Sequence, residues 1–270
     1  MTVLVAIPYW RADPYVERAV RSVLVQTHRD LVCVVIGDGE VPPLPPINDD
    51  RLIVHSYPVN RGAYFAQDVA IWASPFEWYA IVAADDWVDP DHIERLVEQH
   101  ADLACGALWT HGEGEGYCGP DNAGHTSCRG TLVRKLYEVG IYRTERYREI
   151  GAHNPTERIG QDSLTLKVMR IVAPVGASDV PTYNRLFREG SLCTAPETKN
   201  GSPARTQMRV RNRAIVRECE RIARRTLGRD ARASRIRAYR DTLVPREIKD
   251  ALAVEVEALS VKLGRQAVAA

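Results

Sequence analysis

Short apolar segments rich in β-branched residues alternate with helix-start signals through the first hundred residues of this chain. Such segments are typical of buried strands, and the predicted strands are 3–7, 31–36, 51–55 and 79–84. Asp13-Pro14 and Asp89-Pro90 each place a proline in the first turn of a helix. The predicted helices are 15–25, 60–73 and 91–100. This order of elements predicts an open α/β sheet with right-handed crossover connections.

Acidic side chains follow two of these strands. Asp38 comes directly after the second strand, and Asp85 and Asp86 follow the fourth. In an open α/β sheet, ligands bind beyond the carboxyl ends of the strands, so we expect these acids and Trp10 to gather there. Adjacent carboxylates repel one another and raise each other's pKa. We therefore expect a cation between the acid pair and a ligand.

The second half of the chain carries weaker signals. Residues 103–110 have the character of a further strand, whereas residues 131–139 mix strand and helix signals. Apolar side chains recur with a helical period over residues 158–172. From Arg205 onward the sequence predicts helices. Breaks are expected at Gly228 and Pro245.

Composition narrows the class of protein. With 45% hydrophobic and 26% charged residues, a chain of 270 residues can form a large core, which argues against disorder or a disulfide scaffold. The six cysteines show no CxxC spacing, which is typical of reduced thiols, so we expect a cytoplasmic protein. The apolar runs are too short to span a bilayer, and the first residues lack the basic region of a secretory signal.

The net charge of +1 conceals an asymmetry. Residues 201–270 contain 17 Lys and Arg against 8 Asp and Glu, a balance of +9 that leaves −8 for the first 200 residues. Arg213, Arg217, Arg221 and Arg225 recur every four residues and would form one stripe on a helix. Two interpretations stay open: a solvated helix whose arginines pair with the acidic body, or a surface for a polyanion such as DNA or an anionic membrane.

Five segments, in this order, resemble the inverting glycosyltransferases of family 2, which have the GT-A fold. They are VLVAIPYWRADPYVERAVRSVLVQTHRDLVCVVIGDGE, NRGAYFAQDVAI, IVAADDWVDPDHIERL, RIGQDSLTLKVMRI and VPTYNRLFREGSLCT, and they extend from residue 3 to about residue 194. The resemblance implies a Rossmann-like open twisted sheet with helices on both faces. It also implies a nucleotide-sugar-binding half at 1–100, an acceptor-binding half of the same domain at 101–200, and a basic helical extension at 201–270.

For the donor side, the resemblance implies a first nucleotide-binding loop made of Pro8, Tyr9, Trp10 and Arg11. Trp10 would stack on the base, and Asp38 would recognise it. Gly37 stands where the family commonly has a second acid. Arg61 would approach the diphosphate.

For the reaction itself, the resemblance implies that Asp85 holds the ribose and Asp86 a divalent cation, Mn²⁺ or Mg²⁺. Asp162 would be the catalytic base, and Arg185 and Arg188 would lie near the leaving diphosphate. The chemistry agrees with these roles. Hard cations prefer carboxylate oxygens, arginines stabilise the charge that develops on the phosphates, and a carboxylate can take the proton of an attacking hydroxyl.

The expected function is therefore a metal-dependent, inverting transfer of a sugar from a nucleotide-sugar, preferably a UDP-sugar, to an acceptor hydroxyl. The basic tail makes a hydroxymethylated base in DNA one candidate acceptor, beside a polysaccharide, a lipid-linked sugar, a protein or a small molecule. A nucleotidyltransferase is the alternative enzyme class, although no glycine-rich phosphate loop with a lysine follows the first strand. A non-catalytic binding module is the third possibility.

A loop rich in Gly, His and Cys raises the question of a zinc site. His111, Cys118, His125 and Cys128 are zinc ligands by type, but their spacing matches no compact zinc knuckle. We therefore favour a mobile loop that faces the acceptor.

Overall fold

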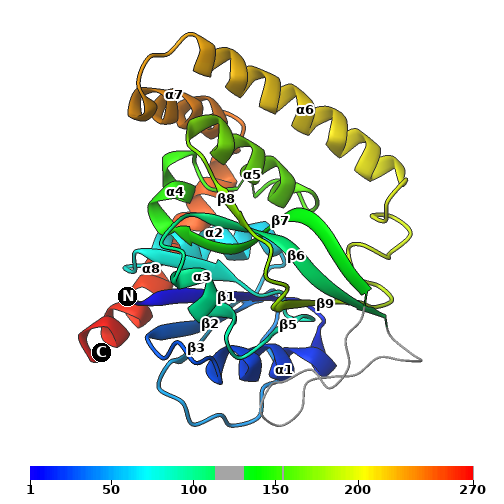
Figure 1. Cartoon of the computed structure of the whole chain (residues 1–270), viewed down its shortest axis with the longest axis vertical. Coiled ribbons are helices and arrows are strands. Elements are labelled where there is room, and N and C mark those ends of the chain that lie inside the picture. Colours follow the sequence, from blue (N-terminus) through cyan, green and yellow to red (C-terminus); the bar gives the residue numbers. More distant parts are fainter. Residues whose placement is uncertain (113–130, 154, 270) are drawn as a thin grey trace.

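The computed structural model describes residues 1–112, 131–153 and 155–269, and these form an α/β fold on one mixed sheet (Figure 1). The strands are β1 Val3–Tyr9, β2 Leu31–Asp38, β3 Leu52–Tyr57, β4 Trp78–Ile81, β5 Trp87–Val88, β6 Leu103–Gly112, β7 Thr131–Arg143, β8 Gly176–Ser178 and β9 Tyr183–Phe187. Their spatial order is β3-β2-β1-β4-β7-β6-β9-β5, and β8 pairs with β6 outside this path. The predicted α/β class and the open sheet are confirmed.

The four strands predicted for the first hundred residues run parallel, with β1 between β2 and β4. Both faces of β1 are buried, because Leu4 and Ala6 belong to one core cluster and Val3 and Val5 to the other. A strand covered on both sides needs apolar residues at every position. The near-continuous apolar runs in the sequence have this origin.

The remaining strands make the sheet mixed. β7 lies antiparallel to both β4 and β6, so the region 131–139, whose signals were mixed, is part of a 13-residue strand. β5, β8 and β9 were not predicted. They contain only two, three and five residues, too few for a periodic pattern to stand out.

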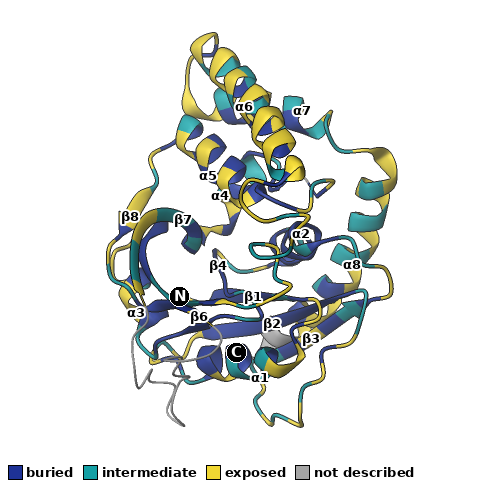
Figure 2. Ribbon diagram, turned by 90° about the vertical axis from the view of Figure 1, so that its right-hand side faces the viewer, coloured by how far each residue is buried: buried dark blue, intermediate teal, exposed yellow. Residues whose placement is uncertain are grey.

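Helices cover both faces of the sheet (Figure 2). They are α1 Asp13–Leu24, α2 Ala63–Ala73, α3 His92–Val97, α4 Thr144–Glu149, α5 Gln161–Val172, α6 Pro203–Arg224, α7 Arg229–Asp241 and α8 Arg246–Ala269. The clusters place α1 and α3 on one face, and α2, α4, α5 and the last three helices on the other. Within the described residues, no helix combines the length and apolar character needed to cross a membrane.

The carboxyl-terminal helices pack on the α/β body rather than standing apart from it. α8 runs back beside α2 and β3 (Figure 1), and Leu259 and Leu263 are fully buried in the cluster that contains Phe65 of α2. His55 of β3 lies 3.0 Å (Nε2 to Oε2) from Glu255 of α8. The expected breaks at Gly228 and Pro245 separate α6 from α7 and α7 from α8. Helix α3 is shorter than predicted.

Candidate functional site

A cavity of about 480 Å³ lies where the carboxyl ends of β1, β2 and β4 meet. Its volume falls within the usual range for small-molecule sites. All but one of the residues proposed from the sequence line it: Pro8, Tyr9, Trp10, Arg11, Asp38, Asp85, Asp86, Asp162, Arg185 and Arg188. The exception is Arg61. The position is the one expected for ligands of an open α/β sheet.

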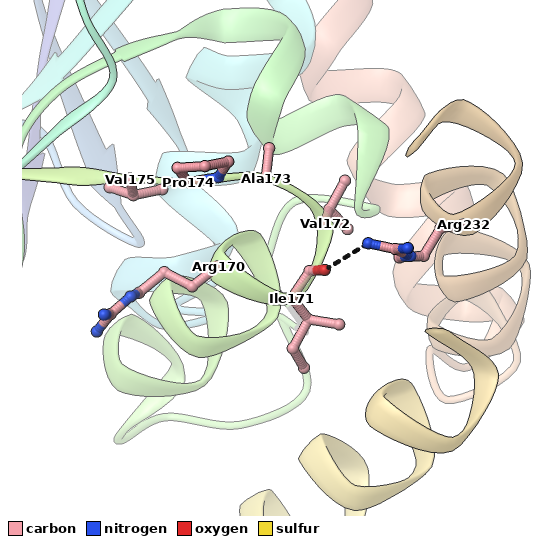
Figure 3. Close-up of a pocket in the computed structure, with 7 residues that line it drawn as sticks. All are labelled: Arg170, Ile171, Val172, Ala173, Pro174, Val175 and Arg232. Carbon is pink, nitrogen blue, oxygen red and sulfur yellow. Dashed lines mark hydrogen bonds between the residues drawn. The ribbon is translucent and has the colours of Figure 1, made fainter. Parts of the chain in front are cut away.

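A second cavity, of about 320 Å³, lies between the end of α5 and helix α7 (Figure 3). It is lined by Arg170, residues 171–175 and Arg232, whose Nη1 donates to the carbonyl of Ile171 at 3.4 Å. Its described lining contains no carboxylate. The first cavity, where acids and arginines converge, is therefore the candidate site.

The acid pair is held by residues far away in the sequence. Arg188 donates from Nε to Asp85 Oδ2 at 2.8 Å. The two oxygens of Asp86 accept hydrogen bonds from the Tyr183 hydroxyl and the Leu186 N–H, both at 2.8 Å. Burial, followed by the charge of Asp85, raises the pKa of Asp86 to about 7. The short strand β9 and the residue that follows it thus fix both carboxylates at the exit of β4.

This donor set fits a divalent cation of the Mg²⁺ or Mn²⁺ type. Such cations take oxygen ligands, and Mg²⁺ is usually held by one or two protein carboxylates together with waters and substrate phosphates. Asp85 and Asp86 supply carboxylate oxygens at the cavity wall. Among the described residues, no group of three or more His, Cys, Asp or Glu could hold a metal by itself. A cation held by the acid pair would therefore need further oxygen ligands, such as those of a substrate phosphate.

Asp38 organises the turn before α2. Its oxygens accept the N–H groups of Arg61 at 2.6 Å and Gly62 at 2.7 Å. Gly62 has a φ of 97°, which a residue with a side chain rarely adopts. The Arg61 guanidinium lies over the Phe65 ring, 5.3 Å from its centroid, outside the cavity lining. Arg158 lines the cavity instead and donates from Nη2 to the Asn60 carbonyl at 3.1 Å.

The loop after β1 presents an aromatic ring at the cavity. Trp10 is 39% exposed, and the Arg11 guanidinium lies over its ring, 4.7 Å from the centroid. Arg11 has a φ of 47°, and its N–H donates to Glu40 Oε1 at 2.5 Å. Tyr9 is buried beneath them, and burial together with its hydrogen bond to Asp13 raises the pKa of Tyr9. A half-exposed indole beside a cavity suits stacking on a planar ligand.

Asp162 stands apart from the acid pair, in the first turn of α5, where the helix dipole favours an anion. The Tyr64 hydroxyl donates to Asp162 Oδ1 at 3.3 Å. Arg185 of β9 and Arg205 of α6 both donate to Cys193 Sγ, at 2.9 and 3.8 Å. Arg158 and Arg205 were not identified from the sequence. Arg158 opens the segment that contains Asp162, but only Asp162 was assigned a role there, and Arg205 lies outside the five resembling segments.

The zinc hypothesis rests mainly on residues outside the described part of the chain, namely Cys118, His125 and Cys128. His111 is described and buried. Its Nε2 lies 3.1 Å from Asn184 Oδ1, and its ring lies 4.7 Å from that of Trp87. The structure thus places His111 against the body of the sheet.

Comparisons with known proteins agree with this geometry. The profile of Glycosyl transferase family 2 matches residues 4–160. Glycosyltransferase GlyA of Streptococcus pneumoniae is 25% identical over 123 residues, which are 42% of this chain and 18% of that protein. Succinoglycan biosynthesis protein ExoO of Rhizobium meliloti is 34% identical over 100 residues, 36% of this chain and 28% of that protein. The matched region is thus less than a third of either relative.

Among solved structures, S. aureus TarS superposes with a TM-score of 0.54 at 16% identity, covering 90% of this chain and 42% of that one. A shorter form, TarS 1-349 in complex with UDP-GlcNAc, gives a TM-score of 0.50 at 18% identity, with coverage of 71% and 60%. At these identities the likeness concerns the fold, and the GT-A-like arrangement is confirmed. Because the family profile spans more than half of the chain, and the five resembling segments converge on one cavity, this protein belongs to glycosyl transferase family 2.

Proposed function

We propose that this chain transfers a sugar from a nucleotide-sugar to an acceptor hydroxyl, in one inverting step that depends on a divalent cation. The observation that carries this proposal is the convergence of the acid pair, several arginines and the separate carboxylate Asp162 on one cavity. A displacement of this kind needs positive charge at the leaving diphosphate and a base at the attacking hydroxyl. The cavity offers a group for each need.

The donor half would bind the nucleoside diphosphate. Trp10 would stack on the base, and Arg185 and Arg188 would bind phosphate oxygens with fixed, always-charged donors. Asp86, assisted by Asp85, would hold a Mn²⁺ or Mg²⁺ ion, which supplies Lewis-acid neutralisation of the leaving group. The UDP-GlcNAc complex of the TarS neighbour supports uridine as the first base to test.

Asp162 would accept the proton of the acceptor hydroxyl as that oxygen attacks the anomeric carbon. The C–O bond to the diphosphate breaks as the new glycosidic bond forms on the opposite face, so the configuration inverts. The Tyr64 hydroxyl, 3.3 Å from Asp162 Oδ1, would hold the carboxylate in place. A base near the acceptor and positive charge near the donor can then act together.

The first experiment is a thermal-shift screen of UDP-, GDP- and dTDP-sugars, each with Mn²⁺, with Mg²⁺ and with EDTA. We expect one nucleotide-sugar to raise the melting temperature only when a divalent cation is present, because ligands that bind the folded state stabilise it. Stabilisation by nucleoside triphosphates and by none of the sugars would favour a nucleotidyltransferase. A shift that persists in EDTA would contradict the metal requirement.

Asp86→Asn is expected to abolish the metal-dependent part of that shift, because a neutral amide binds Mg²⁺ or Mn²⁺ more weakly than a carboxylate does. Asparagine keeps the shape of the side chain and can still accept the hydrogen bond from the Leu186 N–H. Asp179→Asn, at an exposed acid that does not line the cavity, is the control and should keep the full shift. A wild-type, cation-dependent shift in Asp86→Asn would refute the assignment of Asp86.

For the acceptor, we propose a nucleic acid that carries a hydroxyl group on a modified base. The supporting feature is a stripe of four exposed arginines: Arg213, Arg217 and Arg221 of α6, and Arg225 directly after it. Arg221 also pairs with Glu218 of the same helix. Figure 2 shows that much of α6 is exposed. The ion pairs to the acidic body involve other residues, Arg211 with Glu157 and Arg229 with Glu149. The stripe therefore faces solvent instead of neutralising the body, and such a row of charges fits a phosphate backbone.

The test replaces all four stripe arginines by glutamine and measures binding to duplex DNA across a salt series. We expect the salt slope to fall by roughly 0.9 for each phosphate that the variant no longer neutralises. The matched control replaces four exposed arginines elsewhere: Arg21, Arg29, Arg95 and Arg143. Equal binding by both variants would overturn the nucleic-acid proposal. So would binding to phosphatidylserine vesicles but not to DNA, which would identify a membrane surface.

A further inference from the structure

Residues 137–139 of β7 all line the cavity. In a regular strand, consecutive side chains point to opposite faces, so three in a row cannot all face one side. The register shows the reason. Ala104 of β6 pairs with Gly140 and Cys105 pairs with Tyr137, which leaves residues 138 and 139 without partners on β6. A β-bulge of this kind redirects a side chain and is common beside active sites.

The side chain redirected here is a carboxylate, Glu138, which is 6% exposed. His153 holds it, with Nε2 at 3.0 Å from Glu138 Oε1. On its other side His153 binds Asp68 of α2, both through Nδ1 at 2.7 Å and through its backbone N–H at 3.0 Å. The His153 side chain is completely buried. A buried imidazole between two carboxylates has no freedom to turn, so Glu138 is fixed in orientation.

The same group of residues reaches the proposed base. The Tyr64 ring lies 5.3 Å from the His153 ring, centroid to centroid, and the Tyr64 hydroxyl donates to Asp162. Tyr64 also lines the cavity. Glu138 and Asp162 are therefore connected along one wall of the cavity by two aromatic side chains in contact.

Helix α7 supports this wall from behind. Arg240 is 3% exposed and donates from Nη1 to the carbonyls of Ile150 and Ala152, both at 2.7 Å. These carbonyls belong to the turn that carries His153. Because this buried arginine donates hydrogen bonds to two backbone carbonyls, it fixes the conformation of the chain at that turn. The carboxyl-terminal helices therefore help to position a residue group of the cavity.

We propose that Glu138 is an acceptor-binding residue and that His153 is the residue that positions it. This inference rests on the proposed glycosyl transfer. An ionised carboxylate offers about four acceptor sites, of which His153 uses one. Glu138 would accept a hydrogen bond from a donor group next to the attacking hydroxyl, while Asp162 takes the proton of that hydroxyl.

The arrangement also defines the chemical class of the group that enters this part of the cavity. Two carboxylates on one wall repel a charged phosphate or carboxylate group and favour an uncharged group with at least two hydrogen-bond donors. A sugar with neighbouring hydroxyls fits, as does a hydroxymethylated base with an exocyclic amino group. Any phosphates of the acceptor would then lie outside the cavity.

The experiment compares wild type, Glu138→Gln and His153→Gln, with Glu98→Gln at the exposed end of α3 as the matched control. With the donor found by thermal shift, two rates are measured: hydrolysis of the donor by water, and transfer to a model acceptor. The model acceptors are methyl β-D-glucopyranoside and 5-hydroxymethyl-2′-deoxycytidine, and the one that reacts with wild type is used. We expect Glu138→Gln to keep the donor-induced thermal shift and the hydrolysis rate within about twofold. Transfer should fall at least tenfold through a higher KM for the model acceptor, and His153→Gln should show the same pattern.

The outcomes separate the inference from the function on which it rests. If no nucleotide-sugar binds to or is hydrolysed by the wild type, the proposed function fails. If wild type hydrolyses its donor but neither model acceptor becomes glycosylated or slows hydrolysis, the acceptor class is wrong. Normal transfer by Glu138→Gln, or loss of its donor-induced shift, would overturn the role of Glu138. A His153→Gln variant with an unchanged KM for the model acceptor would remove the positioning role.

Discussion

Replacement of Asp162 by asparagine is expected to lower the rate of sugar transfer by roughly 10²–10⁴-fold while the donor binds as before. Asparagine has nearly the same size, and at the start of α5 it can still accept the hydrogen bond from Tyr64. It cannot accept the proton of an acceptor hydroxyl, however. The loss should therefore appear in kcat, with the donor-induced thermal shift unchanged.

The measurement is the single-turnover rate of transfer beside the donor dissociation constant for the same protein. Asp250→Asn on α8, an exposed acid far from the cavity, is the matched control and should behave as wild type. Equal loss of donor affinity and transfer would indicate that Asp162 is structural. Full activity in Asp162→Asn would require a different base, and Glu138, which lines the same cavity, would be the next carboxylate to replace.

The acids that the sequence could identify share a local signature. Asp38 ends β2, Asp85 follows β4, and Asp162 lies in the first turn of α5. Strand ends and helix starts are marked by apolar runs, glycines and prolines, so an acid beside such a mark has a predictable place in the sheet. For Asp38 and Asp85 the order of elements was sufficient to predict this place, whereas Asp162 was identified through the resemblance to family 2.

The residues that the sequence did not identify depend on long-range packing. Glu138 faces the cavity because of a register shift between β6 and β7, and no residue pattern in β7 predicts a bulge there. Arg205 reaches the cavity because α6 starts beside it. Arg61 shows the opposite case. The motif around it was recognised, but its backbone bonds to Asp38 and its side chain packs on Phe65, so Arg158 lies in the cavity instead.

His153 is expected to be a major contributor to stability, and its contribution should depend on pH. Burial by itself lowers the pKa of His153, but the carboxylates of Glu138 and Asp68 outweigh this effect and raise the pKa to about 10. The unfolded value is about 6.5. Because the folded-state pKa is the higher one, the stabilisation is fully present below about pH 6.5 and is lost as pH rises through about 10. Arg240 and Tyr147 also lie close to this group.

His153→Leu removes the cation and leaves two carboxylates buried without it, so we expect a loss of roughly 3–5 kcal/mol in the free energy of unfolding near pH 7. Guanidinium unfolding at pH 6.5 and pH 9.5 measures both effects, with His28→Leu at the surface as the control. Burial also raises the pKa of Cys105 and of Cys219 to about 11. The free energy of unfolding of wild type and of His153→Leu should therefore both fall at alkaline pH, where these thiols ionise in the unfolded chain first. The difference between wild type and His153→Leu removes this shared part. That difference should shrink between pH 6.5 and pH 9.5. A constant difference would mean that His153 is neutral in the folded protein. One of the two carboxylates beside it would then be protonated instead.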